Sequence, residues 1–203
     1  MKINQLLKEL HYDYQFPINN SQKEFDDITI DSRTAKPENL FIAFRGFKTD
    51  GHKYINDAFS QGCRNFVVEH IKSINDRTRN ESNIVIVKDS RQAISKFSNA
   101  LFGFPYNKIN MIGITGTKGK TSTSSILYEL LSNFQKTSLF TTIKNIINGK
   151  STDSVRTTME ANQLIRELSN SLKENTKNAV VEVSSHAITL KRIEDIQWDS
   201  CFF

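Results

Sequence analysis

Cysteine is scarce in this sequence, and the two that are present carry no metal-ligand spacing. Cys63 and Cys201 are the only two cysteines in 203 residues. Zinc clusters need several cysteines or histidines at short fixed spacings, so the pattern gives no support for one. Reduced thiols in a cytoplasmic protein are therefore expected.

Long apolar runs and clusters of one charge are also missing. No run approaches membrane-spanning length, and residues 1–8 lack the continuous apolar core of a signal peptide. Lysine and arginine outnumber acidic residues by 27 to 22, but they are scattered and do not alternate with aromatic residues. Contact with a membrane or a nucleic acid is therefore not expected. Small anionic substrates explain the net charge of +5 at least as well, and a solvated lysine-rich surface explains it most simply.

The N-terminal half alternates helix and strand patterns. Helices are predicted over 3–10, 55–59 and 93–101, and strands over 27–30, 40–44, 66–68 and 84–87. This alternation is typical of an α/β fold. A break at Gly103 and Pro105 predicts a domain boundary, which gives domains over 1–104 and 105–203.

The most informative stretch is the glycine-rich segment 113–122. A short apolar strand over 108–112 precedes it, and a segment with helical spacing over 123–131 follows it. In that context glycines let backbone N–H groups point at phosphate oxygens, while Lys120 reaches the outer phosphates and Thr121 offers a hydroxyl to Mg²⁺. The predicted ATP-binding residues are Gly116, Thr117, Lys118, Gly119, Lys120, Thr121 and Ser122.

This segment departs from the strict Walker pattern. Ile114 stands where the strict pattern has a glycine, and the glycines here fall at 113, 116 and 119. An alternative interpretation is that these glycines only form a tight turn.

A second chemical feature is Glu182 within an apolar strand. Val180, Val181 and Val183 indicate a strand buried on both faces, where an unpaired carboxylate is unfavourable. Because ligands gather at the carboxyl ends of parallel strands, we expect Glu182 to meet the phosphate loop and share a Mg²⁺ ion with Thr121. The alternative is that Glu182 lies near a strand end and points to water.

Between these features the sequence predicts a strand over 137–142, a turn at Asn148-Gly149, and a helix carrying Leu164 and Leu168. Thr157 followed three residues later by Glu160 is a capping-box pattern, so the helix is predicted to begin at Thr157. A helix N-terminus with the two hydroxyls of Thr157 and Thr158 is also suited to holding a carboxylate or phosphate.

The glycine-rich loop resembles that of the Mur ligases, and further runs resemble the MurE type. These are Asp31-Ser32-Arg33 with Pro37 and Asp50-Gly51-His52, the pair Thr157-Thr158, and Glu182-Val183-Ser184-Ser185-His186-Ala187 followed by Arg192. The resemblance covers essentially the whole chain. It implies a small N-terminal α/β domain that binds a UDP-sugar, followed by an incomplete Rossmann-like phosphate-loop ATPase domain with a mostly parallel sheet.

The resemblance also implies roles for particular residues. Ser32, Thr157, Thr158, Ser184 and Arg192 would contact UDP-N-acetylmuramoyl-L-alanyl-D-glutamate. Lys120 and Glu182 would be the catalytic pair. Residues 47–49 occupy the place of another family contact. The implied reaction is ATP-dependent addition of a diamino acid (lysine, diaminopimelate or ornithine) through an acyl phosphate, by a monomer that uses ATP and Mg²⁺.

The sequence ends within the predicted strand 197–203. Further domains of the family follow this point, so a truncated or split member that is inactive alone is expected. The alternative function is a non-catalytic remnant that binds a nucleotide or UDP-sugar. The pattern does not indicate which diamino acid is added.

Overall fold

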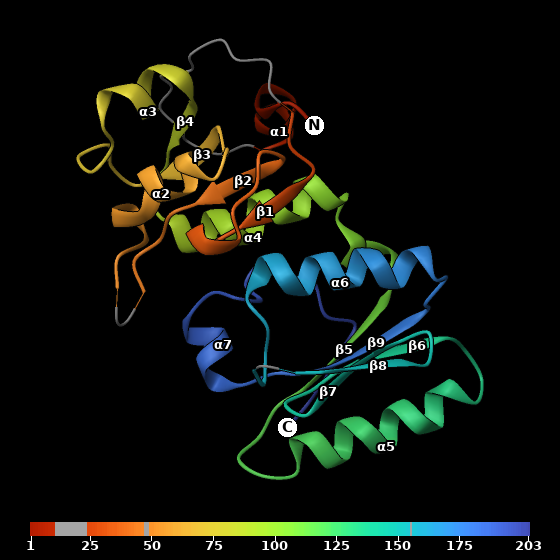
Figure 1. Ribbon diagram of the computed structural model, residues 1–203. Helices are drawn as coiled ribbons and strands as arrows, with labels where there is room; N and C mark the ends of the chain where they lie inside the picture. The colour runs from red at the N-terminus through yellow and green to blue at the C-terminus, as the bar shows by residue number, and fades with distance from the viewer. Residues whose placement is uncertain (11–23, 47–48, 155) are drawn as a thin grey trace. The chain divides into compact units, whose positions relative to one another are not determined.

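The chain folds into two compact units. The computed structural model describes residues 1–10, 24–46, 49–154 and 156–203, and it divides into unit 1, Met1–Leu101, and unit 2, Phe102–Phe203 (Figure 1). None of the helices in the described ranges has the length and apolar content needed to cross a membrane.

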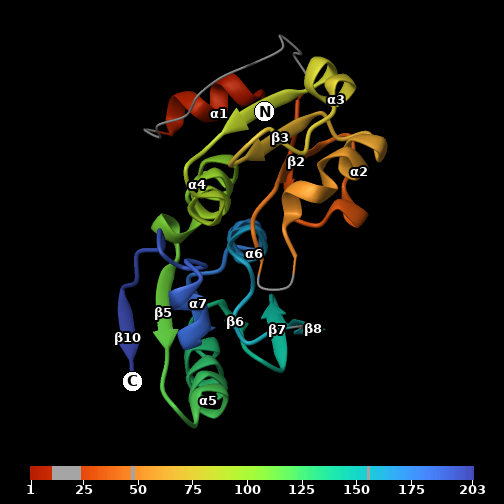
Figure 2. The same ribbon diagram turned by 90° about the vertical axis from the view of Figure 1, so that its left-hand side faces the viewer.

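Unit 1 is a parallel sheet covered on both faces. Its strands are β1 (Asp27–Thr29), β2 (Asn39–Ile42), β3 (Asn65–Val68) and β4 (Asn83–Ile86), paired in that order. Its helices are α1 (Ile3–Glu9), α2 (Ile55–Ser60), α3 (Asp76–Glu81) and α4 (Ser90–Phe102), with single 3₁₀ turns at Ser32–Thr34 and Gly51–Tyr54. Figure 2 shows α1 and α4 on one side of the sheet and α2 on the other. Strands β2 and β3 are accordingly buried along their whole length.

Unit 2 is a mixed sheet in the order β10-β5-β9-β6-β7-β8. Strands β5 (Asn110–Ile114), β6 (Thr137–Phe140), β9 (Asn178–Glu182) and β10 (Ser200–Phe202) are parallel, while β7 (Lys144–Ile147) and β8 (Lys150–Asp153) form an antiparallel hairpin. A 3₁₀ turn at Pro105–Lys108 precedes β5.

Two long helices cover opposite faces of the unit 2 sheet, as Figure 1 shows. Helix α5 (Lys120–Ser132) packs Leu127 and Leu131 against one face, and α6 (Ala161–Lys173) packs Leu164 and Leu168 against the other. A short helix, α7 (Ser185–Thr189), follows β9. The two faces exclude water from the middle of the sheet, so a polar group there needs an internal partner.

The predicted α/β class with mostly parallel sheets is confirmed. The strand before the glycine-rich loop is Asn110–Ile114 and not 108–112, because Lys108 belongs to the preceding 3₁₀ turn. The Asn148-Gly149 turn is confirmed, since both residues have positive φ (49° and 74°) and join β7 to β8. The two strands of that hairpin were not predicted, because the segment is mostly polar. Strand β8 is exposed at all its positions.

Gly62 in unit 1 is restricted both by its backbone conformation and by a close neighbour. Its φ is +100°, and a Cβ there would lie 2.8 Å from Pro37 Cγ. Gly103 also has a positive φ, of +70°, but nothing lies within 4 Å of its added Cβ. We expect Gly62→Ala to lower the free energy of unfolding by about 2 kcal/mol or more, and Gly103→Ala by about 1 kcal/mol. Urea denaturation of both variants tests this, and equal losses would contradict the role given to Pro37.

Candidate nucleotide and anion site

The glycine-rich loop connects the end of β5 to the start of α5. Gly119 is the N-cap of α5 with φ of 79°, and Gly116 has φ of 137°, so both take conformations that favour glycine. Thr117, Lys118, Gly119 and Ser122 are exposed. The free N–H groups at the start of α5 therefore face solvent beside the loop, as phosphate binding requires.

Lys120 is the first residue of α5 and folds back over the loop. Its Nζ donates a hydrogen bond to the Gly116 carbonyl oxygen at 2.9 Å. The ammonium group thus lies against the concave backbone of the loop, where it can turn to a bound phosphate by rotation of its side chain.

Glu182 and Thr121 meet at the same edge of the sheet. The Thr121 hydroxyl donates to Glu182 Oε2 at 2.9 Å, and the Thr142 N–H donates to the same oxygen at 3.0 Å. Glu182 is 2% exposed, which rules out the alternative that it points to water. It pairs in register with Ile114, the last residue of β5, so the strand order itself brings the carboxylate to the loop.

The donor set at this point fits Mg²⁺. A threonine hydroxyl and a carboxylate are hard oxygen ligands, and Mg²⁺ is commonly held by one or two carboxylates together with substrate phosphates. Thr121 and Glu182 would hold the ion. The Thr142 contact was missed by the sequence reasoning, although its position at the carboxyl end of the predicted strand 137–142 is a signal for it.

A second polar cluster gathers three of the predicted substrate residues. The Thr158 hydroxyl lies 2.9 Å from the Glu182 carbonyl oxygen and 3.4 Å from Ser184 Oγ. Arg192 donates from its NH1 to the Thr158 carbonyl oxygen at 3.1 Å. The Ser184 hydroxyl also accepts the Ala187 N–H at 3.2 Å and so caps α7. Thr157 is half-buried next to Thr158.

The predicted capping box at Thr157 is wrong. Helix α6 begins at Ala161, and Glu160 is its N-cap with no side-chain cap bond. The Glu160 carboxylate instead pairs with Arg192 NH2 at 2.8 Å and with Arg156. An ion pair with two guanidinium groups is stronger than a single bond to a backbone N–H, and it draws the Glu160 side chain away from the helix start.

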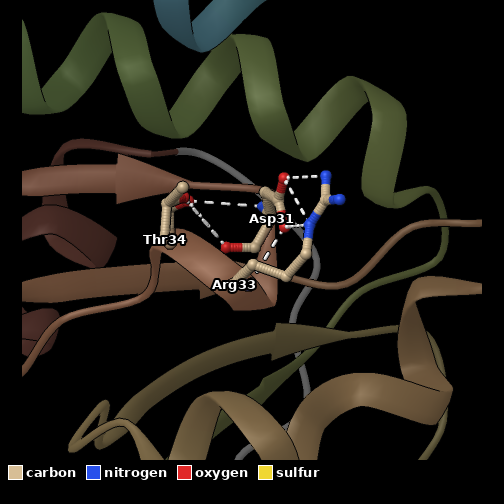
Figure 3. Close-up of polar contacts among 4 residues, drawn as sticks. Asp31, Arg33 and Thr34 are labelled. Carbon is tan, nitrogen blue, oxygen red and sulfur yellow. Dashed lines mark hydrogen bonds and ion pairs between the residues drawn. The ribbon is translucent and has the colours of Figure 1, made fainter.

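Ser32, the remaining predicted substrate residue, belongs to unit 1. It is the first residue of a 3₁₀ turn whose N-cap is Asp31 (Figure 3). Arg33 donates to the Asp31 carboxylate from its Nε at 2.9 Å and its NH2 at 2.6 Å, while the Thr34 hydroxyl donates to the Asp31 carbonyl at 3.1 Å. These bonds fix the turn that presents Ser32. The further family contact expected over 47–49 lies outside the described residues at Phe47 and Lys48.

Three potential metal ligands also meet in unit 1, but His52 already uses both of its ring nitrogens in hydrogen bonds. Ligand atoms of Asp50, His52 and His70 lie within 4.8 Å of one another. His52 Nδ1 is 2.6 Å from Asp50 Oδ1, and His52 Nε2 accepts the Glu69 N–H at 2.9 Å. A neutral imidazole has one donor and one acceptor nitrogen, so His52 has no lone pair left for an ion. The hydrogen bonds of His52 therefore connect the segments that follow β2 and β3.

The mostly parallel sheet of unit 2, its glycine-rich loop and the buried carboxylate beside that loop define a phosphate-loop nucleotide-binding α/β protein. Family models give the particular family. The model of the Mur ligase middle domain matches residues 114–203, and that of the Mur ligase family catalytic domain matches residues 24–101. The chain belongs to the Mur ligase family, as its motifs predicted.

Curated relatives share the whole length of this chain. The UDP-N-acetylmuramoyl-L-alanyl-D-glutamate–2,6-diaminopimelate ligase of Clostridium perfringens is 35% identical over 204 residues, which cover 100% of this chain and 41% of the relative. The corresponding L-lysine ligase of Staphylococcus haemolyticus is 34% identical over 87% of this chain and 35% of its own length. The chain thus spans about two fifths of the length of the first of these relatives.

Solved structures agree on the fold. A UDP-N-acetylmuramoyl-L-alanyl-D-glutamate–2,6-diaminopimelate ligase structure matches 99% of this chain and 40% of its own, with a TM-score of 0.74 and 21% identity. The MurF ligase of Thermotoga maritima, solved in complex with ADP, matches 77% of this chain and 31% of its own, with a TM-score of 0.52 and 26% identity.

Replacement of Lys120 tests the loop. We expect Lys120→Ala to weaken ADP binding by about tenfold or more, because a charge-assisted bond to phosphate is lost. Lys150→Ala is the matched control, since Lys150 lies in β8, outside the loop, and removes the same charge. Titration calorimetry of both variants measures the difference, and equal affinities would contradict the site.

Acid titration tests the turn that carries Ser32. The Arg33 hydrogen bond to the Asp31 side chain holds the pKa of that carboxyl below its ordinary value, against the opposing effect of partial burial. Because the folded-state pKa is lowered, the stabilising contribution is present above about pH 4 and is lost as the pH falls through the folded value. Arg33→Ala should raise the pKa of Asp31 toward its ordinary value in an NMR titration. Arg77→Ala, which removes an arginine paired elsewhere with Glu81, should leave it unchanged.

Proposed function

We propose that this chain forms the UDP-sugar-binding and ATP-binding part of a MurE-type ligase. The reaction is the ATP-dependent addition of a diamino acid to UDP-N-acetylmuramoyl-L-alanyl-D-glutamate, a step of peptidoglycan precursor synthesis in the cytoplasm. The observation that carries the proposal is the bond between Thr121 and Glu182, which joins the phosphate loop to a buried carboxylate. The names of the curated relatives support the choice of substrate.

Catalysis of the proposed reaction depends mainly on the positions of charged groups. In the proposed reaction the D-glutamyl carboxylate attacks the γ-phosphorus of ATP and ADP leaves. The amine of the diamino acid then attacks the carbonyl carbon of the acyl phosphate, which forms the amide bond and releases inorganic phosphate and a proton. In the first step the negative charges of the carboxylate and the phosphates must be neutralised as the carboxylate oxygen approaches phosphorus. In the second step the negative charge that develops on the carbonyl oxygen and the leaving phosphate must be stabilised. Lys120 and the N–H groups at the start of α5 supply positive charge at the phosphates. Mg²⁺, held by Thr121 and Glu182, supplies the rest when bound.

Substrate contacts are proposed for residues of unit 1 and of unit 2 separately. Ser32 would contact the nucleotide end of the substrate, and Thr157, Ser184 and Arg192 would contact its peptide end. The side chain of Thr158, which the sequence also predicted as a contact, is 2% exposed and is not available to the substrate. Arg192 suits this role because its side chain is 13% exposed and hydrogen-bonded at both NH groups, so the guanidinium plane is fixed before an anion binds. A fixed guanidinium loses little entropy on binding a carboxylate.

Separate titrations of ADP and of UDP-N-acetylmuramoyl-L-alanyl-D-glutamate test the proposal. We expect both ligands to bind, and we expect Mg²⁺ to tighten ADP binding. Glu182→Gln should remove most of that Mg²⁺ effect, since a neutral amide is a poor Mg²⁺ ligand. A matched Glu174→Gln change, in the turn after α6, should retain it.

The outcomes separate the proposed ligase part from its alternatives. Binding of both ligands by this chain supports the proposal. Binding of the UDP-dipeptide without ADP would favour a UDP-sugar-binding remnant, and binding of neither would contradict the proposed function altogether.

A further inference from the structure

Thr158 has a side chain that is committed to the interior of the protein. It is 2% exposed, its hydroxyl donates to the Glu182 carbonyl oxygen at 2.9 Å, and it accepts the Ser184 N–H at 3.0 Å. A hydroxyl has one donor and two acceptor positions, so the donor is used and the side chain has almost no surface to offer a ligand. The neighbouring Thr157 carries the same side chain and is only half-buried.

The main chain of Thr158 is held from the other side by Arg192. Arg192 NH1 donates to the Thr158 carbonyl oxygen at 3.1 Å, and Arg192 NH2 pairs with Glu160 Oε1 at 2.8 Å. Both charged side chains are largely buried, at 13% and 14% exposed. A buried, hydrogen-bonded ion pair resists movement, because separating the charges leaves each unpaired. The backbone of Thr158 is therefore fixed by the ion pair of Arg192 and Glu160.

Thr158 is also connected to the predicted metal ligand Thr121, through Glu182. Glu182 accepts the Thr158 hydroxyl at its carbonyl, and its carboxylate accepts the Thr121 hydroxyl and the Thr142 N–H. A continuous series of hydrogen bonds thus runs from Arg192 through Thr158 and Glu182 to Thr121. Its members lie on different elements: the loop after α7, the loop before α6, the end of β9 and the start of α5.

We infer that Thr158 is a positioning residue that fixes the end of β9, so that the Glu182 carboxylate meets Thr121 in the geometry that Mg²⁺ requires. The inference rests on the proposed function. Mg²⁺ demands nearly ideal octahedral geometry at short distances, so a small shift of one ligand weakens its binding more than it weakens a contact to phosphate. The hydroxyl of Thr158 therefore affects the metal-dependent part of nucleotide binding, and the loop contacts are independent of it.

The test compares ADP dissociation constants with Mg²⁺ and with EDTA. The quantity of interest is their ratio, the factor by which Mg²⁺ tightens ADP binding. Thr158→Val keeps the shape but removes the hydroxyl, so it should lower this ratio by about tenfold and leave the affinity in EDTA unchanged. Thr158→Ser keeps the hydroxyl and should retain the ratio. Thr152→Val, the same change on the exposed strand β8 and outside both sites, should also retain it.

Arg192→Gln gives a second reading that does not alter the hydroxyl. It removes the hydrogen bond to the Thr158 carbonyl, so it should lower the same ratio although Arg192 is not one of the proposed nucleotide or metal contacts. This variant decides the matter if Thr158→Val fails to fold, as judged by circular dichroism. A ratio unchanged in Arg192→Gln would then overturn the inference.

The remaining outcomes are equally decisive. An unchanged ratio in Thr158→Val would overturn the inference, as would an equal loss of affinity with and without Mg²⁺, because that loss is expected of a merely structural residue. Failure of the unaltered chain to bind ADP would instead contradict the proposed function. The two failures are therefore distinguishable.

Discussion

A carboxylate buried at the end of a central strand is the constraint on which the unit 2 structure depends. Glu182 lies at the end of β9, between β5 and β6, where removal from water would be unfavourable without partners. It finds them in the hydroxyl of Thr121 and the N–H of Thr142. One side chain thereby ties the start of α5 to the end of β6.

Because Thr121 is bonded to Glu182, the glycine-rich loop and the end of the sheet form one site. The glycines allow the chain to turn from β5 into α5, but the loop alone does not determine where the first turn of the helix lies. The Thr121 contact does so by fixing α5 to the strand that neighbours β5. On the other side of Glu182, Thr158 and Arg192 extend the same network toward residues proposed to hold the peptide. The two halves of the proposed chemistry therefore share one rigid strand end.

The sequence predicted the features that depend on local pattern. The glycine spacing, the buried valine strand and the Asn148-Gly149 turn each have a local cause, and each is present in the structure. The approach of Glu182 to Thr121 was also predictable, because parallel strands end at the same edge.

The sequence could not predict features that depend on distant partners. Glu160 follows Thr157 at capping-box spacing, yet it pairs with Arg192, which lies beyond β9 in the sequence. Local pattern gives no weight to such a partner. The contacts of the Thr158 hydroxyl could not be predicted for the same reason. Its partners, Glu182 at the end of β9 and Ser184 at the start of α7, lie more than 20 residues later in the sequence. In unit 1, His52 likewise accepts a hydrogen bond from the backbone N–H of Glu69, which lies 17 residues later in the sequence.

In the proposed site Lys120, Thr121 and Glu182 hold one nucleotide and its metal at the shared edge of β5 and β9. A crystal structure of this chain grown with ADP and Mg²⁺ would show whether they do. We expect ADP phosphates on the backbone N–H groups of 116–122, Lys120 turned from Gly116 to a phosphate, and Mg²⁺ beside Thr121 and Glu182. Phosphates bound elsewhere, or a metal that contacts neither side chain, would contradict the proposed site.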